Sequence, residues 1–114
     1  MGLFTVNEAP HIKISIARDF TISPGARSIK DGPKSGEEFR QNFLDKHFKN
    51  SRDEIIQIDL DGVEGYATSF LEEAFGGLAR EYGKELVEQK LQFISDEDPV
   101  LINEIKGYIR SANS

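Results

Sequence analysis

The stretch IQIDLDGVEGYATSFLEEAFGGLAR, residues 56–80, decides the fold of this chain. It opens within EIIQIDL (54–60), a short and nearly continuous apolar run that is typical of a strand covered on at least one face. An Asp-Gly pair ends the run. Beyond it the apolar residues recur at helical spacing, and Gly83 follows as a stop signal. The sequence therefore predicts a strand that turns directly into a helix over 69–82.

The remaining elements alternate around this unit. Two strands are predicted before it, at 3–6 and 11–17, and a capping-box pattern predicts a helix over about 36–49. After it, the sequence predicts a strand over 85–94 and a last helix that begins near Asp98-Pro99, with Val100 in its buried stripe. This order predicts an α/β fold: an about four-stranded mixed sheet with about three helices, mainly on one face.

Composition restricts the class of protein. The chain has 114 residues, a net charge of -6 and no cysteine. We expect residues 1–114 to form a single domain, without disulfides or thiolate metal sites. The acidic balance argues against nucleic-acid binding, and no segment resembles a signal peptide or a membrane span. A cytoplasmic protein without a cofactor, a nucleic-acid partner or a membrane partner is expected.

Carboxylates gather where the 54–60 strand ends. Asp59, Asp61 and Glu64 could bind a hard metal or perform acid–base chemistry. Neither of the two histidines is spaced to assist them, and no Ser-His-Asp pattern has supporting context. These residues are better explained as strand-end and turn residues, so the sequence assigns neither a catalytic residue nor a metal ligand.

A basic, Gly-rich loop at 23–36 runs into the first predicted helix. Backbone N–H groups and the helix dipole at such a junction can hold an anion, although a plain surface loop is the simpler explanation. The loop lacks the glycine spacing of a P-loop. It supports an alternative function, a small-ligand or nucleotide-binding domain. The candidate partner- or anion-binding residues are Arg27, Lys30, Lys34, Ser35, Gly36 and Arg40.

Two hydroxyls open the helix predicted over 69–82. Ser69 and Glu72 match a capping box, which would satisfy free backbone donors at the helix start. A helix start also favours an added phosphate, so Thr68 and Ser69 are candidate switch residues.

Two adjacent glycines interrupt the same helix. Gly76 and Gly77 each cost roughly 1 kcal/mol relative to alanine. Close packing against a neighbour, or a smooth docking patch for a partner, would offset this cost. Together with Glu72 and Glu73 they complete the candidate interaction residues of the helix.

The run from 56 to 78 resembles the strand–turn–helix signature of STAS domains, the fold of bacterial anti-sigma-factor antagonists. Gly62-Val63 matches the turn of that signature, and Thr68 falls at the hydroxyl that the family phosphorylates. Ala67 stands where the signature has Asp, and Phe70 where it has Gly.

A closer resemblance is to a bacterial STAS-like family of unknown function. Two blocks carry it, GARSIKDGPKSGEEFR (25–40) and SFLEEAFGGLAR (69–80). The resemblance implies a non-enzymatic signalling module that interacts with other proteins. Relatives often occur near histidine-kinase-type ATPase domains, so it also implies such an ATPase as the partner and phosphorylation of Thr68 or Ser69 as the switch.

Overall fold

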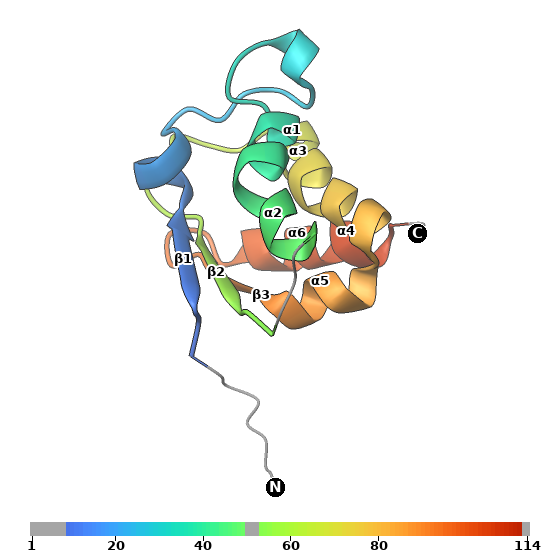
Figure 1. Cartoon of the computed structure of the whole chain (residues 1–114). Coiled ribbons are helices and arrows are strands. Elements are labelled where there is room, and N and C mark those ends of the chain that lie inside the picture. Colours follow the sequence, from blue (N-terminus) through green and yellow to red (C-terminus); the bar gives the residue numbers. More distant parts are fainter. Residues whose placement is uncertain (1–8, 50–52, 113–114) are drawn as a thin grey trace, which may run out of the picture.

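A computed structural model describes residues 9–49 and 53–112 (Figure 1). Within these residues, three parallel strands form one sheet in the order β1-β2-β3. The expected mixed, four-stranded sheet is therefore corrected to a three-stranded parallel one; the predicted strand at 3–6 lies outside the described residues. The strands are β1 (Ile12–Ser15), β2 (Ile56–Asp59) and β3 (Leu91–Ile94).

Both long helices predicted from the sequence are present, each with a π-helical turn in its middle. Helix α1–α2 consists of α1 (Gly36–Phe39), a π-helical turn (Arg40–Leu44) and α2 (Asp45–Lys49). Helix α3–α4 consists of α3 (Thr68–Leu71), a π-helical turn (Glu72–Gly76) and α4 (Gly77–Tyr82). The other helical segments are Ile16–Phe20, Ile29–Asp31, α5 (Lys84–Lys90) and α6 (Val100–Arg110).

The prediction of a strand over 85–94 was wrong in its first part. Residues 84–90 form α5, and only 91–94 form β3. The segment ELVEQK contains strong helix formers, and its burial follows a helical period, with Val87 and Lys90 inside and Glu88 outside. The apolar residues at the two ends of 85–94 had suggested one longer strand. With α5, the described part of the chain has more helical segments than the three expected.

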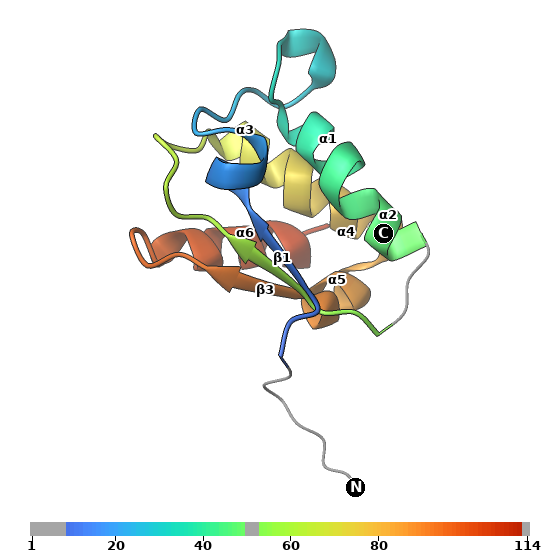
Figure 2. The same cartoon turned by 60° about the vertical axis from the view of Figure 1, so that its left-hand side comes forward.

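The helices lie on one face of the sheet. In Figure 2, β1 and β2 pass in front of α6, and helix α1–α2 stands to the right of the strands. Alternation along the strands explains this, because Ile14, Ile56 and Ile58 are buried towards the helices. On the other face, Lys13 pairs in register with Gln57, which pairs in register with Gln92. A polar outer row of this kind needs no covering layer.

A cluster of phenylalanines joins the two long helices. The ring centroids of Phe39 and Phe70 are 6.3 Å apart, and those of Phe39 and Phe75 are 6.2 Å apart. Gly36 permits the approach, since a Cβ at that position would lie 2.4 Å from the backbone oxygen of Phe70. The starts of both helices, α1 and α3, are thereby held side by side, below the loop at the top of Figure 1.

None of the helices in the described part of the chain has the length and apolar character needed to cross a membrane.

Candidate functional site

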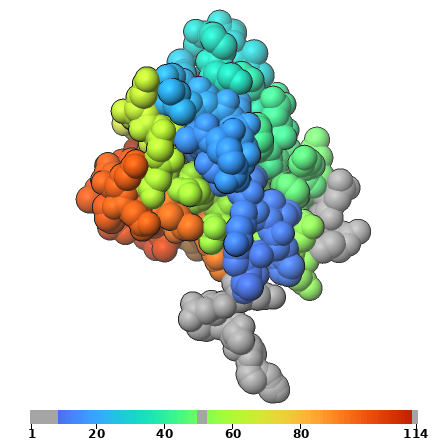
Figure 3. All heavy atoms as spheres, turned by 90° about the vertical axis from the view of Figure 1, so that its left-hand side faces the viewer, coloured from blue at the N-terminus to red at the C-terminus, as the bar shows by residue number. Residues whose placement is uncertain are grey.

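A pocket of about 240 Å³ lies at the carboxyl ends of β2 and β3. Its lining residues come from the segments 60–66 and 95–101, which Figure 3 shows side by side in yellow-green and orange. In α/β folds, this edge is where ligands and partners generally bind, because several loops converge there. The pocket is thus the first place to examine for function.

Reciprocal hydrogen bonds fix the two loops of the pocket. The carboxylate of Asp61 accepts the backbone N–H groups of Asp96 and Glu97, each at 3.0 Å. In return, Glu97 Oε1 accepts the N–H of Gly62 at 3.0 Å. Asp59 Oδ1 accepts the N–H of Asp61. These contacts agree with the interpretation of the two aspartates as strand-end and turn residues.

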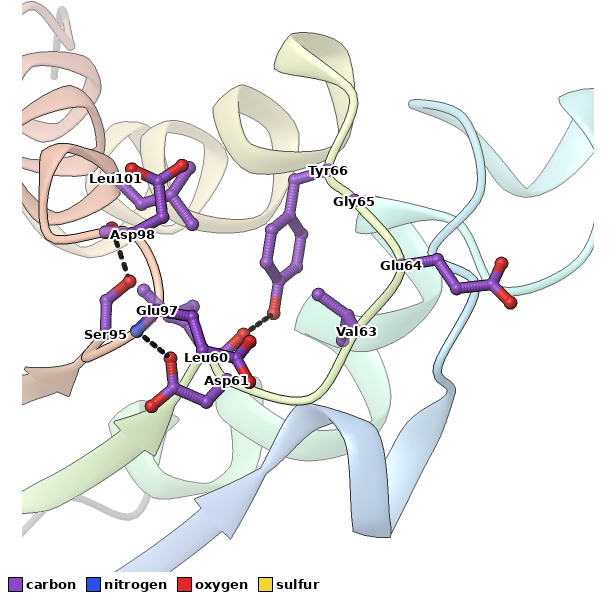
Figure 4. A pocket seen from close by; sticks show the side chains of 10 residues that line it. All are labelled: Leu60, Asp61, Val63, Glu64, Gly65, Tyr66, Ser95, Glu97, Asp98 and Leu101. Atoms are coloured by element: carbon purple, nitrogen blue, oxygen red, sulfur yellow. Dashed lines mark hydrogen bonds between the residues drawn. The ribbon is translucent and has the colours of Figure 1, made fainter.

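The carboxylates at this edge are not gathered around one point. Within 9–49 and 53–112, no three histidine, aspartate or glutamate side chains are close enough together to hold a metal ion. Glu64 accepts a hydrogen bond from Ser23 Oγ at 2.7 Å, and Figure 4 shows its carboxylate directed away from Asp61.

Tyr66 stands in the middle of the pocket (Figure 4). Its hydroxyl donates a hydrogen bond of 2.8 Å to the backbone oxygen of Leu60. Burial raises the pKa of the Tyr66 hydroxyl well above its ordinary value, and the negative charges of Asp59, Asp61 and Glu97 raise it further. The surroundings of this side chain are therefore electrically negative.

Thr68 and Ser69 lie at the first two positions of helix α3–α4, next to the pocket in sequence. Thr68 is exposed and Ser69 is half-buried. The predicted capping box was wrong, because the helix begins one residue earlier than expected and Ala67 occupies the N-cap without a side-chain acceptor. Among the described residues, the backbone N–H groups of Thr68 and Ser69 have no hydrogen-bond acceptor. This helix start is open to solvent.

The start of helix α1–α2 is the opposite case. The N–H groups of Gly36 and Glu37 donate to carbonyl oxygens of the preceding loop, at 2.9 and 3.0 Å. The N–H of Glu38 donates to Ser35 Oγ at 3.0 Å, which confirms the predicted serine cap. The donors that an anion would need here are already occupied by the protein.

Arg27 of the basic loop and Arg40 of helix α1–α2 form ion pairs with acidic residues of helix α3–α4. Arg27 Nη1 forms an ion pair with Glu72 and lies 3.5 Å from Glu73 Oε1. Arg40 Nη2 lies 2.8 Å from Glu73 Oε2, and Arg80 closes the network on Glu72. The structure thus brings Arg27 and Arg40 beside the predicted helix surface, as expected, but their charges are balanced by its glutamates.

The same network shifts the pKa of Glu72. A hydrogen bond from Arg80, assisted by one from Arg27, lowers the pKa of this carboxyl group, although burial acts in the opposite direction. The ion pairs therefore favour the ionised form of Glu72.

The two helical glycines make room for these side chains. A Cβ at Gly76 would lie 2.7 Å from Glu72 Oε2, and one at Gly77 would lie 3.0 Å from Arg40 Nε. Close packing against a neighbour accounts for Gly77, which Arg40 of helix α1–α2 approaches, whereas the side chains nearest to Gly76, Glu72 and Arg80, belong to the same helix.

Two lysines of the basic loop stand outside this network. Lys30 and Lys34 are exposed, and neither forms an ion pair with another described residue. The ammonium group of Lys34 lies 5.0 Å from the ring centre of Phe20. The ligand-binding alternative for loop 23–36 stays a prediction.

Sequence reasoning missed several residues of the pocket. Tyr66, Glu97, Asp98 and Leu101 all line it. In the sequence, Asp98-Pro99 was interpreted only as a helix start, but Asp98 does not cap α6 with its side chain. The sequence could have indicated that segments 60–66 and 95–101 lie together, because segments that follow neighbouring parallel strands emerge at the same edge of a sheet.

The segment that contains the pocket matches a known protein family. The model of a family described as a STAS-like domain of unknown function (DUF4325) matches residues 35–101. The chain belongs to this family. The match includes helix α3–α4 and both loops of the pocket, whereas most of the basic loop precedes it. No curated protein and no solved structure matches the chain significantly.

Proposed function

We propose that this STAS-like domain is a non-enzymatic regulatory module that docks a protein partner. Its docking surface consists of the pocket at the carboxyl edge of the sheet and the adjoining helix start, Thr68 and Ser69. The observation that carries the proposal is the exposed Thr68 at a helix start with unpaired backbone donors, two residues after the pocket residue Tyr66.

Exposed apolar side chains adjoin the docking surface. Ile22 is 53% exposed, and its backbone oxygen accepts the N–H of the pocket residue Glu64 at 2.8 Å. Val100, predicted to be buried, is 58% exposed because it begins α6 just before the pocket residue Leu101. Apolar groups beside a pocket offer a partner surface to desolvate.

The partner that we propose is a histidine-kinase-type ATPase, as the family resemblance implies. Such an enzyme would transfer the γ-phosphoryl group of ATP to the hydroxyl oxygen of Thr68 or Ser69, releasing ADP and the hydroxyl proton. The product would carry about -1.5 to -2 charges at a helix N-terminus, where the dipole and free N–H groups stabilise an anion. Docking would change while the core stayed folded.

Binding to a histidine-kinase-type ATPase from the same cells tests the docking proposal. We expect T68E and V100E to weaken binding by roughly tenfold or more, since each places a charge in the contact. The matched control is N42D, which adds a charge on the exposed side of helix α1–α2 and should bind like the wild type. Equal affinities for all four proteins would contradict the proposed surface.

Phosphorylation needs a separate measurement. Mass spectrometry of the protein from its native cells should detect phosphate on Thr68 or Ser69. If neither residue carries phosphate under any growth condition, the switch is rejected, while docking without modification is still supported by the binding experiment.

A further inference from the structure

Among the residues that the structure describes, the carboxylates of the pocket have no cationic partner. Asp61 and Glu97 accept only backbone N–H groups, and neither they nor Asp98 form an ion pair with any Lys, Arg or His of the described chain. The glutamates of helix α3–α4 differ, because Glu72 and Glu73 are each paired with arginines. Negative charge at the pocket, where Glu97 and Asp98 are exposed, is therefore available to attract a cationic group of a partner.

The walls of the pocket suit a flat organic cation. Figure 4 shows the Tyr66 ring between Val63 on one side and the loop of Glu97 and Asp98 on the other, with Leu101 beside Asp98. Apolar and aromatic walls would cover an aliphatic stem, and the carboxylates lie nearby for a charged end. At about 240 Å³, the pocket is below the usual range for drug-sized ligands, roughly 300–1,000 Å³, and is of a size for one side chain.

We propose that this pocket binds an arginine side chain presented by an exposed segment of the partner protein. The inference rests on the proposed docking function and names the chemistry of its central contact. A guanidinium group is planar, weakly hydrated and able to stack on a tyrosine ring while it donates paired hydrogen bonds to carboxylates. An ammonium group matches such a site less well, and a nucleotide would meet repulsion from the carboxylates.

The net negative charge of the chain favours the approach of a basic partner segment. A net charge of -6 attracts such a segment from a distance, which raises the rate of encounter. Ile22 and Val100 would then contact apolar residues that flank the arginine.

A titration of the whole chain with a small probe tests the pocket directly. N-acetyl-arginine amide is added while the backbone amide signals of Gly65, Tyr66 and Leu101 are followed by NMR. We expect saturable shifts that are confined to the pocket and weaken as salt is added. N-acetyl-citrulline amide, equal in shape but uncharged, should produce none of them. The absence of pocket shifts with arginine amide, or equal shifts with both probes, would overturn the inference.

A charge-removing variant makes the test specific to the carboxylates. In E97Q/D98N the amide oxygen of Gln can still accept the N–H of Gly62, so we expect the loop to keep its shape. Affinity for arginine amide should fall by roughly tenfold. The matched control D31N/E85Q removes two charges from exposed positions outside the pocket and should stay within about twofold of the wild type. Equal weakening by both variants would overturn the inference.

The two proposals can fail separately. If the domain binds the ATPase but E97Q/D98N binds it as tightly as D31N/E85Q does, the docking function stands and the arginine contact is overturned. If arginine amide binds the pocket but no ATPase binds the domain, the pocket chemistry is supported and the proposed partner is rejected.

Discussion

Replacing Gly36 by alanine tests how closely the two long helices must approach. The new Cβ would lie 2.4 Å from the backbone oxygen of Phe70 and 3.2 Å from Glu73 Cβ. Real Cβ atoms essentially never come closer than 3.0 Å to another heavy atom, so the backbone of α3 would have to withdraw by about 0.6 Å. A backbone oxygen cannot rotate away as a flexible side chain can.

The expected cost follows from the packing around this contact. Withdrawal loosens the Phe39–Phe70 contact, where both rings are fully buried. Overpacking of a core costs about 1–3 kcal/mol, and the better helix propensity of alanine returns at most about 1 kcal/mol. We expect G36A to lower the free energy of unfolding by about 1–2 kcal/mol and the melting temperature by roughly 3–10 °C.

Equilibrium unfolding in urea, followed by far-UV circular dichroism, measures this change. The matched control is G107A in α6, because a Cβ there meets no atom within 4 Å. It should stabilise the protein by about 0.5–1 kcal/mol. If G36A were as stable as the wild type while G107A gained stability, the close approach of α1 and α3 would be refuted.

Three further substitutions test local energetics. Ala67→Ser should raise the free energy of unfolding by about 0.5–1.5 kcal/mol in thermal melts, because the N-cap already has extended geometry (φ -74°, ψ 143°) and lacks only an acceptor; no gain would contradict an open helix start. The pKa of Glu72 in the folded protein lies below its ordinary 4.5, so the stabilisation by its ion pairs is present above pH 4.5 and is lost as the pH falls through the folded pKa. In urea unfolding, the difference in unfolding free energy between wild type and E72Q should therefore shrink below pH 4.5. A difference that stays constant with pH would speak against the ion pairs. Burial lowers the pKa of His47 below 6.5, so the free energy of unfolding should decline as the pH falls below that value. H47Q should flatten this decline between about pH 7.5 and 5.5. An identical slope of unfolding free energy against pH in both proteins would count against the burial effect.

Local patterns in the sequence were enough for part of the candidate site. The position of Thr68 at the start of a helix, directly after a strand and turn, followed from the apolar periodicity of residues 56–80. The cap by Ser35 followed from a serine placed three residues before a glutamate. The cap by Ser69 did not form, because the same letters cannot tell which residue is the first in the helix.

Other parts of the site depend on contacts between distant segments. Arg27 is paired with Glu72, which lies 45 residues further along the chain. Local sequence patterns cannot show that two such distant residues are in contact. The same holds for Gly77, whose missing side chain makes room for Arg40. Periodicity identified the glycines as unusual but could not identify their neighbours.

By itself the sequence determined the alternation of strands with helices, the apolar faces and the family resemblance, because each is written in residues that are close along the chain. Only the tertiary structure decided that α5 is a helix, that Arg27 of the loop is paired with Glu72, and that the loop after β3 joins the turn after β2 around Tyr66. The physical reason is that ion pairs, close approaches and pockets arise from distances through space, which are fixed only when the whole core packs.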